Sequence, residues 1–216
     1  KATKLKSTYI EGLIALIADD GKIHPHFNQT VAATGRISCT EPNLQNIPIR
    51  DEYGRNIRKA FVTSDENHTF IGADYSQIEL RILAALSGDE SLINAFNNNE
   101  DIHRITASRV FNVPLDQVTP LDRSRAKAVN FGVIYGMSGF GLSEELMISR
   151  AEAQRYIDDY FLKHTSVKAY IDEQIKIGER YYAVKTIMGR IRQIPEFASR
   201  KYMDRQFANR LAMNTP

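Results

Sequence analysis

The sequence predicts an α+β fold in which short strands flank a long helical region. Two observations lead to this prediction. Apolar residues recur almost continuously at helical spacing between about residue 92 and residue 178. Short apolar runs bounded by turn residues occur before and after this stretch, and such runs are typical of strands. The hydrophobic fraction of 43% and the charged fraction of 25% are those of an ordinary globular protein.

The first part of the chain is expected to combine one helix with short strands. Residues 5–18 carry apolar side chains near helical spacing and predict an amphipathic helix, which the turn residues 19–22 end. Residues 23–33 alternate and suggest a strand, and residues 60–62 suggest another. Residues 40–48 contain two prolines and three amide side chains, so we expect an ordered loop.

A buried strand followed by a helix is predicted around Asp74. Phe70–Ala73 form a short apolar run that ends at Asp74, and a helical pattern follows. Ser76 and Glu79 have the spacing of a capping box, so the helix should begin at Ser76 and end at Gly88. A carboxylate at the end of a buried strand is a common metal or phosphate ligand. Without further context, however, such an aspartate more often interacts with the free amide groups at a helix start.

The rest of the chain is predicted to form helices, then a strand followed by a turn, and a last helix. The helices are predicted over about 92–98, 101–111, 121–136, 142–147, 149–163 and 166–178, the strand over 182–186 with its turn at Gly189, and the last helix over 199–213.

The local distribution of charge says more about possible ligands than the net charge does. The formal net charge is +2, which does not indicate a nucleic-acid-binding protein. Between Lys185 and Arg210, seven basic residues stand against two acidic ones. Such a run could follow a phosphate backbone or be the solvated face of a helix. Cys39 is the only cysteine, which excludes an internal disulfide and fits a cytoplasmic protein. No apolar run reaches the ~18 residues of a membrane span, so no membrane partner is expected.

Four residues of the helix predicted over 121–136 stand four positions apart: Arg123, Lys127, Phe131 and Tyr135. Such a row drifts by only about 40° per step and forms one stripe. An amphipathic helix would place cations and rings on opposite faces. Their shared stripe suits a ligand with a polyphosphate at one end and a flat ring at the other. Gly132 costs about 1 kcal/mol inside a helix, which suggests close approach by another group.

Several segments resemble motifs of the family A DNA polymerases, of the bacterial DNA polymerase I type. Residues 74–81, DYSQIELR, resemble motif A, and residues 123–136, RSRAKAVNFGVIYG, resemble motif B. Residues 34–38 and 42–48 are similar to segments that these enzymes place against the minor groove of primer–template DNA. The similarity runs in order over almost the whole chain, and it includes residues 101–103 and 210–216.

The resemblance implies a right-hand polymerase, with a mostly helical fingers subdomain inserted into the palm sheet. Residues 1–100 would be part of the palm with motif A, residues 101–190 the fingers with the motif B helix, and residues 191–216 the return toward the palm. The sequence lacks an initiator Met, and we expect it to be a piece of a longer protein. A later His-Asp-Glu motif with the second metal-binding carboxylate would follow Pro216. The isolated piece is therefore expected to be inactive without the remainder of the polymerase chain.

The resemblance also implies the chemistry, which is template-directed nucleotidyl transfer from a dNTP to a primer 3′-hydroxyl. Asp74 would bind two catalytic Mg²⁺ ions, and the backbone carbonyl of Tyr75 would bind one. Two such metals activate the attacking hydroxyl and hold the leaving pyrophosphate. Lys127 would act as the general acid for the pyrophosphate.

Further side chains would bind the dNTP. His103, which alone would be interpreted as structural or solvated, would grip the triphosphate with Arg123 and Lys127. Phe131 would pack on the deoxyribose. Glu79 would close off the 2′ position, in competition with its capping-box role, and Tyr135 would sit where the templating base enters. Gln77 of motif A would also belong to the dNTP site.

Primer–template DNA is the second expected ligand. Arg36, Asn43, Gln45 and Asn46 would lie along the minor groove, and Arg210 and Asn214 would lie near the template strand. Minor-groove acceptors are nearly the same for every base pair, so polar contacts there can check pair geometry without reading sequence. Ser124, Ile191 and Asn209 depart from the residues usual in the family, which leaves individual DNA contacts open. The protein would act in the bacterial cytoplasm, at the nucleoid.

Two other functions remain open from the residues alone. The chain could be a non-catalytic module that binds DNA or nucleotide. Asp74 could also belong to a hydrolase site such as a phosphatase, although that hypothesis leaves the stripe of cations and rings without a role.

Overall fold

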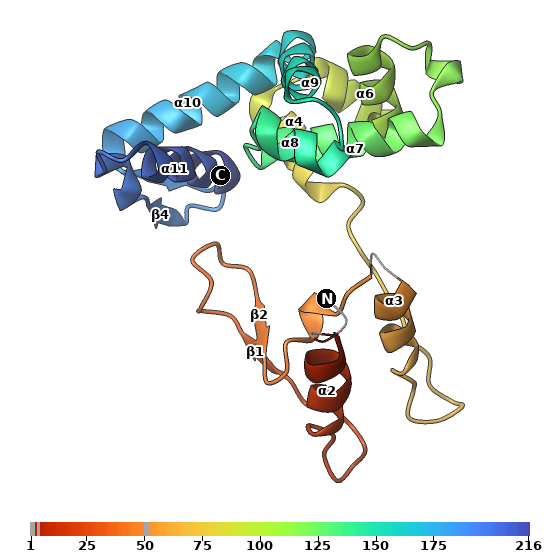
Figure 1. Cartoon of the computed structure of the whole chain (residues 1–216). Coiled ribbons are helices and arrows are strands. Elements are labelled where there is room, and N and C mark those ends of the chain that lie inside the picture. The colour runs from red at the N-terminus through yellow and green to blue at the C-terminus, as the bar shows by residue number, and fades with distance from the viewer. Residues whose placement is uncertain (1–2, 4, 50–51) are drawn as a thin grey trace. The chain divides into compact units, whose positions relative to one another are not determined.

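The computed structural model describes residue 3 and residues 5–49 and 52–216, and the chain forms two compact units (Figure 1). Unit 1 comprises Lys1–Asp74 and unit 2 comprises Tyr75–Pro216. Among the described residues, each unit combines helices with one two-stranded antiparallel sheet. The mostly helical content with small sheets agrees with the predicted α+β class.

Unit 1 contains short elements joined by long connections. Its elements are the π-helix η1 (Leu5–Glu11), α2 (Gly12–Ile14), β1 (His26–Asn28), β2 (Ser38–Thr40), the 3-10 helix η2 (Leu44–Asn46) and α3 (Glu52–Lys59). The strands pair with His26 opposite Thr40. The N-terminal helix is therefore shorter than the predicted 5–18, and the strand predicted over 23–33 is confined to β1. Residues 60–62 form no strand.

The sequence reasoning missed α3, although the segment carries a signal for it. Glu52 lies in the first turn, and Arg58 and Lys59 lie in the last, so both ends complement the helix dipole. Arg58 also donates a hydrogen bond to the carbonyl of Ile47 at 2.9 Å, which ties α3 to the loop after β2. The mainly polar composition of the segment concealed this helix.

The buried strand predicted over Phe70–Ala73 is wrong. These residues have no regular secondary structure, and the side chains of Phe70 and Ile71 are 68% and 89% exposed. A strand needs a partner to complete its hydrogen-bond ladder, and none of the described residues pairs with this run. Periodicity in a short apolar run does not reveal whether a partner is present.

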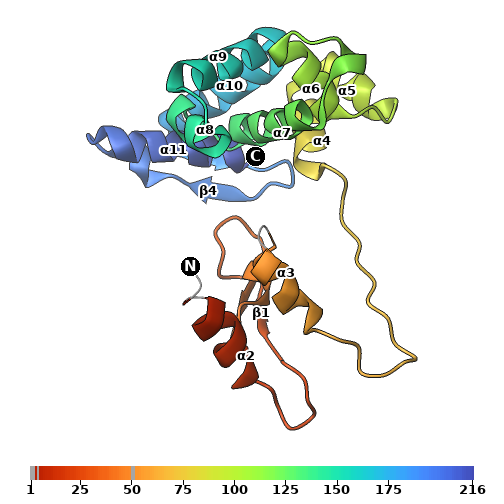
Figure 2. The same cartoon turned by 45° about the vertical axis from the view of Figure 1, so that its right-hand side comes forward.

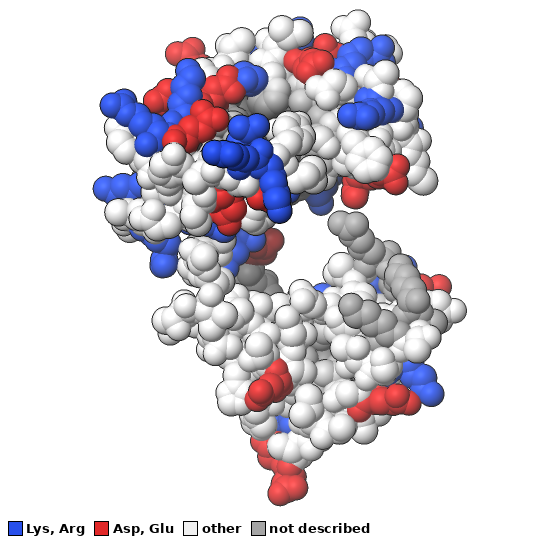
Figure 3. All heavy atoms as spheres, turned by 60° about the vertical axis from the view of Figure 1, so that its left-hand side comes forward, with Lys and Arg blue, Asp and Glu red and all other residues white. Residues whose placement is uncertain are grey.

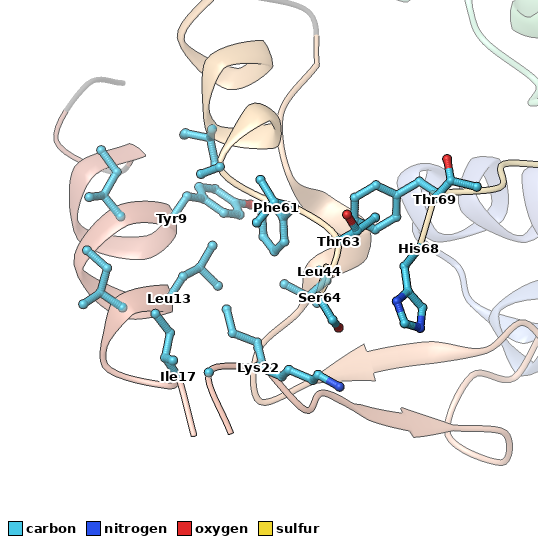
Figure 4. Close-up of a pocket in the computed structure, with 18 residues that line it drawn as sticks. Tyr9, Leu13, Ile17, Lys22, Leu44, Phe61, Thr63, Ser64, His68 and Thr69 are labelled. Atoms are coloured by element: carbon cyan, nitrogen blue, oxygen red, sulfur yellow. The ribbon is translucent and has the colours of Figure 1, made fainter. Parts of the chain in front are cut away.

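Apolar side chains of unit 1 also line a pocket of about 630 Å³ (Figure 4). Tyr9, Leu13 and Ile17 approach it from η1, α2 and the residues that follow, and Phe61 and Phe70 approach it from the segment after α3.

Unit 2 is largely helical. Its elements are α4 (Ile78–Ser87), α5 (Glu90–Asn97), α6 (Ile102–Phe111), η3 (Leu115–Gln117), α7 (Pro120–Ile134), α8 (Gly139–Leu146), α9 (Arg150–Lys163), α10 (Thr165–Tyr181), β3 (Ala183–Lys185), β4 (Ile191–Gln193), η4 (Pro195–Ala198) and α11 (Tyr202–Asn214).

Two apolar clusters hold unit 2 together, and α10 leads from one to the other (Figure 1). The larger cluster includes Leu80, Val129 and Tyr160, each fully buried, and it joins α4 to α9 with the first part of α10. The smaller one packs the β3–β4 hairpin against α11 through Val184 and Ala208. Within the larger cluster, α7 packs against both α6 and α8 (Figure 2).

Capping residues explain where most helices of unit 2 begin. Asp89, Asp101, Ser138 and Ser149 each accept a backbone N–H in the first turn of the following helix. Gly88 ends α4 with a φ of 63°, as the sequence predicts. The six helices predicted between residues 92 and 178 are all present, with ends shifted by a few residues.

The predicted start of α4 is wrong. The helix begins at Ile78, and Gln77 precedes it with a left-handed φ of 53° and no side-chain cap. Ser76 and Glu79 therefore do not form a capping box. The complete capping box in unit 2 lies before α7 instead, between Thr119 and Asp122.

No helix among the described residues is long and apolar enough to cross a membrane.

Candidate functional site

The stripe predicted on α7 faces solvent. Arg123, Lys127 and Tyr135 are exposed and Phe131 is half-buried. The opposite face of the helix, which includes Val129, is buried in the larger apolar cluster. The capping box and Pro120 at the first helical position fix the start of α7, and Tyr135 is its C-cap. The helix thus presents its cations and rings together, as their spacing predicts.

Arg123 is anchored by Asp101, the residue that caps α6. Arg123 Nε donates to Asp101 Oδ2 at 2.6 Å, while Asp101 Oδ1 accepts the backbone N–H groups of His103 and Arg104 at 3.1 and 3.2 Å. Partial burial acts to raise the pKa of Asp101, but the hydrogen bonds from Arg123 and the Arg104 backbone outweigh it and the pKa is lowered. The ionised carboxylate therefore joins the starts of α6 and α7.

His103 is buried between α6 and α7, with only 3% of its surface exposed. Asn130 Nδ2 lies 2.9 Å from its Nδ1, and Thr106 donates to Asn130 Oδ1 at 3.0 Å. Burial lowers the pKa of His103, and the nearby charges of Arg123 and Lys127 lower it further, against the opposing effect of Asp101. The imidazole is therefore neutral near pH 7.

Phe131 connects the histidine to the rest of the stripe. Its ring centroid lies 6.0 Å from that of His103 and 6.4 Å from that of Tyr135, with the Phe131 and Tyr135 rings only 12° from parallel. Lys127 Nζ lies 5.9 Å from the same ring centre. Cations, an imidazole and two flat rings thus follow one another along one exposed surface of unit 2.

Gly132 does not have the role that its position suggests. It is buried, and a Cβ at this position would meet Met137 and Leu142 at 3.5 to 3.8 Å, which is ordinary van der Waals contact. The glycine faces the apolar core, and no tight approach in unit 2 requires it.

Glu79 lies at the far end of the stripe, where α4 meets α7. The hydroxyl of Tyr135 donates to Glu79 Oε2 at 2.8 Å. Arg81 fixes the chain just before α4, because its Nε donates to the carbonyl of Ser76 at 2.9 Å. Gln77, which follows Ser76 and precedes α4, is half-buried and has a left-handed conformation.

The predicted minor-groove residues of unit 1 belong to one ordered segment around η2. Asn43 caps η2 by accepting the N–H of Gln45 at 3.1 Å, and Gln45 Nε2 lies 3.5 Å from the carbonyl of Ile37. Tyr9 donates to the carbonyl of Asn46 at 2.7 Å. Arg36, Asn43, Gln45 and Asn46 all expose their side chains.

Arg210 and Asn214 lie on α11, and both are exposed. A Cβ at Gly136 would come within 3.1 Å of Arg210 Cγ, so the turn after α7 lies directly against α11. Basic side chains of unit 2 are interspersed with acidic ones over the face drawn in the upper part of Figure 3.

The structure brings together only part of the predicted site. His103, Arg123, Lys127, Phe131, Tyr135 and Glu79 form one array in unit 2. Asp74 is exposed at the end of unit 1 and Tyr75 opens unit 2, with its side chain 79% exposed. No group of three or more potential metal-ligating side chains occurs among the residues that the structure describes. The metal-binding and DNA-binding roles stay predictions.

Sequence reasoning gave no role to Asn130 or Thr106, or to the carboxylate of Asp101. A signal for Asn130 was present, because it stands between Val129 and Phe131 on a helix whose neighbouring positions are apolar. An amide on a buried helix face must find hydrogen-bond partners there.

The comparisons with known proteins give a definite result. The sequence profile described as DNA polymerase family A matches residues 1–216. The chain belongs to DNA polymerase family A. Among curated members of the family, DNA polymerase I of Bacillus subtilis (strain 168) is 53% identical over 214 residues, which are 99% of this chain and 24% of that protein. DNA polymerase I of Mycobacterium tuberculosis (strain H37Rv) is 50% identical with the same coverage.

A solved structure agrees with this family A membership. The POL domain of Pol1 from M. smegmatis, in complex with DNA primer–template and dNTP, matches with a TM-score of 0.89 at 48% identity. The match covers 100% of this family A chain and 38% of the solved chain. The chain thus spans about a quarter of the length of the curated relatives described above.

Proposed function

We propose that the protein containing this chain is a DNA-directed DNA polymerase, which transfers a nucleotide from a dNTP to the 3′-hydroxyl of a DNA primer. The observation that carries this proposal is the solvent-facing array on α7, in a chain that belongs to family A. The solved relative in complex with primer–template and dNTP supports the same substrates. The cytoplasm, where the bacterial chromosome lies, is the proposed location, because the relatives are bacterial.

The array on unit 2 is the proposed dNTP site. A triphosphate needs cations and hydrogen-bond donors, and Arg123, Lys127 and His103 supply them side by side. Phe131, next along the stripe, offers a flat apolar surface to the deoxyribose. Lys127 is the candidate general acid, because an ammonium group can protonate the leaving pyrophosphate.

The 2′ side of the sugar is assigned to Glu79. Tyr135 holds the Glu79 carboxylate at 2.8 Å, and this contact limits the positions that the carboxylate can take. A fixed carboxylate beside the 2′ carbon leaves no room for a ribose hydroxyl. Tyr135 itself is proposed to occupy the position that the templating base enters, and Gln77 is proposed to line the same site.

Asp74 and the carbonyl of Tyr75 are the proposed ligands of two Mg²⁺ ions. The fit is chemically sound, because carboxylate and carbonyl oxygens are the ligands that Mg²⁺ prefers, and Asp74 is exposed and free of regular secondary structure. When bound, the metals would activate the primer hydroxyl and neutralise charge on the phosphates.

Contacts to DNA are proposed for both units. Arg36, Asn43, Gln45 and Asn46 would face the minor groove, and Arg210 and Asn214 would face the template strand. In the right-hand arrangement, residues 1–100 would belong to the palm, residues 101–190 to the fingers and residues 191–216 to the return toward the palm. The chain supplies about a quarter of its relatives' length, and we propose that these 216 residues alone do not extend a primer.

Primer extension by the full polymerase tests the proposal. Lys127→Ala should lower kcat/KM for dNTP by about 100-fold or more, because a positioned general acid contributes about 10²- to 10⁴-fold. Lys176→Ala is the matched control, since Lys176 is an exposed lysine on α10. It should leave kcat/KM within about twofold of the wild type, as expected for a surface substitution.

The opposite results would redirect the assignment. Equal activity of the two lysine variants would remove Lys127 from the dNTP site. DNA or nucleotide binding by the full wild-type protein without primer extension would favour a non-catalytic binding module.

A further inference from the structure

A chain of buried hydrogen bonds lies behind the proposed triphosphate site. Thr106, Asn130 and His103 are 1%, 0% and 3% exposed. The Thr106 hydroxyl donates to Asn130 Oδ1 at 3.0 Å, and the amide nitrogen of Asn130 faces His103 Nδ1 at 2.9 Å. Thr106 and His103 are on α6 and Asn130 is on α7, so the chain crosses the packed interface between the two helices.

This arrangement determines which ring nitrogen of His103 carries the proton. An amide NH₂ group can only donate, so His103 Nδ1 must accept and carries no proton. The proton of the neutral ring is then on Nε2. Nε2 makes no hydrogen bond within residues 5–49 or 52–216, and it is not among the buried side-chain atoms without a partner. This nitrogen therefore keeps some contact with solvent, and the His103 ring lies next to Phe131, with ring centroids 6.0 Å apart.

We propose that Asn130 is a positioning residue for dNTP binding, which holds His103 with Nε2–H directed at a phosphate oxygen of the nucleotide. Thr106 supports it by fixing the orientation of the amide. The inference rests on the proposed function, because it takes the array on α7 as the triphosphate site. It adds a residue that contacts no nucleotide atom and acts through the imidazole.

The surrounding charges favour a neutral His103 as the donor. Among the described residues, the charged groups that perturb its pKa are Asp101 at the start of α6 and Arg123 and Lys127 on α7. Burial is the largest effect and lowers the pKa, and the two cations add to it. A neutral ring donates to phosphate from Nε2 only in the tautomer that is protonated there, and the Asn130 amide favours that tautomer.

A second buried histidine in unit 2, His164, shows the opposite proton position on its ring. His164 Nδ1 lies 3.4 Å from Asp89 Oδ1, and this histidine is 2% exposed. A carboxylate can only accept, and the Ser91 hydroxyl, also 3.4 Å from Nδ1, donates its hydrogen to Asp89 Oδ1 at 2.7 Å, so His164 Nδ1 carries a proton. The amide at Asn130 and the carboxylate at Asp89 thus impose opposite proton positions on the facing ring nitrogen.

Asn130→Asp replaces the hydrogen-bond donor that faces His103 Nδ1 with an acceptor, with almost no change in side-chain shape. A neutral His103 would then hold its proton on Nδ1, and Nε2 would present a lone pair to the phosphate. A protonated His103 would still donate from Nε2. The ratio of the dNTP KM values of Asn130→Asp and the wild type should therefore rise with pH in the full polymerase. The rise should reach about tenfold or more between about pH 6 and about pH 8.5, a range spanning the ordinary His pKa.

The same ratio in a His103→Ala background separates positioning from simple repulsion. There the added carboxylate still repels phosphate, but it has no imidazole to act through, so the ratio should not change with pH. A ratio that is independent of pH in the wild-type background overturns the proposal. So does an equal rise in both backgrounds.

Thr106→Val provides a second variant that adds no charge. It frees the Asn130 amide to turn and should raise the dNTP KM by about three- to tenfold, the value of one ordinary hydrogen bond. Thr165→Val, an exposed position at the start of α10, is its control and should leave the KM unchanged. Equal KM values for the two valine variants would count against the hydrogen-bond chain.

The proton position itself can be observed without nucleotide. Nitrogen chemical shifts of ¹⁵N-histidine distinguish protonated from bare ring nitrogens, and the His103→Ala variant identifies the signals of His103. The wild-type protein should show Nε2 protonated at neutral pH, and a proton on Nδ1 would overturn the inference. Failure of the wild-type polymerase to extend primers would instead overturn the proposed function and leave this result intact.

Discussion

At the scale of single residues, Arg123 has a partner before any nucleotide binds. Its Nε is occupied by Asp101 at 2.6 Å. A guanidinium has five N–H donors, so the terminal NH₂ groups can still meet a phosphate. The pair holds the head group in place, which lowers the entropy lost on binding. The spacing of the stripe predicts the cation but not the carboxylate that orients it, because Asp101 is far away in sequence.

The contact between Tyr135 and Glu79 leads to a testable prediction about the preference for deoxyribose over ribose. In the full polymerase, Tyr135→Phe removes the hydroxyl that holds Glu79 at 2.8 Å. A less restrained carboxylate should tolerate a ribose 2′-hydroxyl better. The preference for dNTP over rNTP, measured as the ratio of the two kcat/KM values, should fall by about three- to tenfold, the value of one hydrogen bond.

The control for this change is Tyr202→Phe, an exposed tyrosine at the start of α11. It should leave the preference for dNTP unchanged. An unaltered preference in Tyr135→Phe would show that Glu79 does not depend on this contact to exclude the 2′-hydroxyl.

At the scale of elements, most helices could be predicted, whereas only two of the four described strands, β1 and β3, were. Helix signals are local: the 3.6-residue period, the caps Asp89 and Asp101, and Gly88 at the end of α4 all lie within or beside the helix. A strand depends on a partner whose distance along the chain the sequence does not reveal. The run at Phe70–Ala73 therefore suggested a strand although none of the described residues pairs with it.

The false capping box before α4 has the same kind of cause. Ser76 and Glu79 have the correct spacing, but Glu79 finds a partner in Tyr135, far away in sequence, and Gln77 takes a left-handed conformation. A tertiary contact thus overrides a local preference. Before α7, Thr119 and Asp122 form the complete box because their neighbours permit it.

The capping box of α7 should contribute measurably to stability. Thr119→Ala removes the hydroxyl that accepts the N–H of Asp122 at 3.2 Å. We expect the free energy of unfolding of unit 2 to fall by about 1 kcal/mol, the usual cost of losing an N-cap. Urea unfolding of the 216-residue chain, followed by circular dichroism at helical wavelengths, measures it.

Ser124→Ala, at an exposed position within the same helix, is the control and should increase the stability by a few tenths of a kcal/mol at most. If Thr119→Ala unfolds at the same urea concentration as this control, the box does not stabilise α7.

At the scale of the whole molecule, the family and much of the proposed dNTP site could be predicted from the sequence, because its motifs lie on continuous segments. The sequence did not predict the division into two compact units after Asp74. That division follows from the density of packing. Unit 2 has two buried clusters, whereas the residues just before the division, including Phe70 and Ile71, are exposed and irregular. Helical periodicity identifies packed segments, but an unpacked one has no comparable signal.

The irregular segment that ends unit 1 should be the first place where a protease cuts the 216-residue chain. Proteases need an exposed stretch that can become extended, and helices resist them until they open locally. Phe70 and Tyr75 are 68% and 79% exposed and lie outside helices and strands. Limited chymotrypsin digestion followed by mass spectrometry should therefore give first cuts after these two residues. Phe207 is 43% exposed but lies within α11, so it serves as an internal control. Earlier cleavage at Phe207 would mean that α11 opens more readily than the segment between the two units.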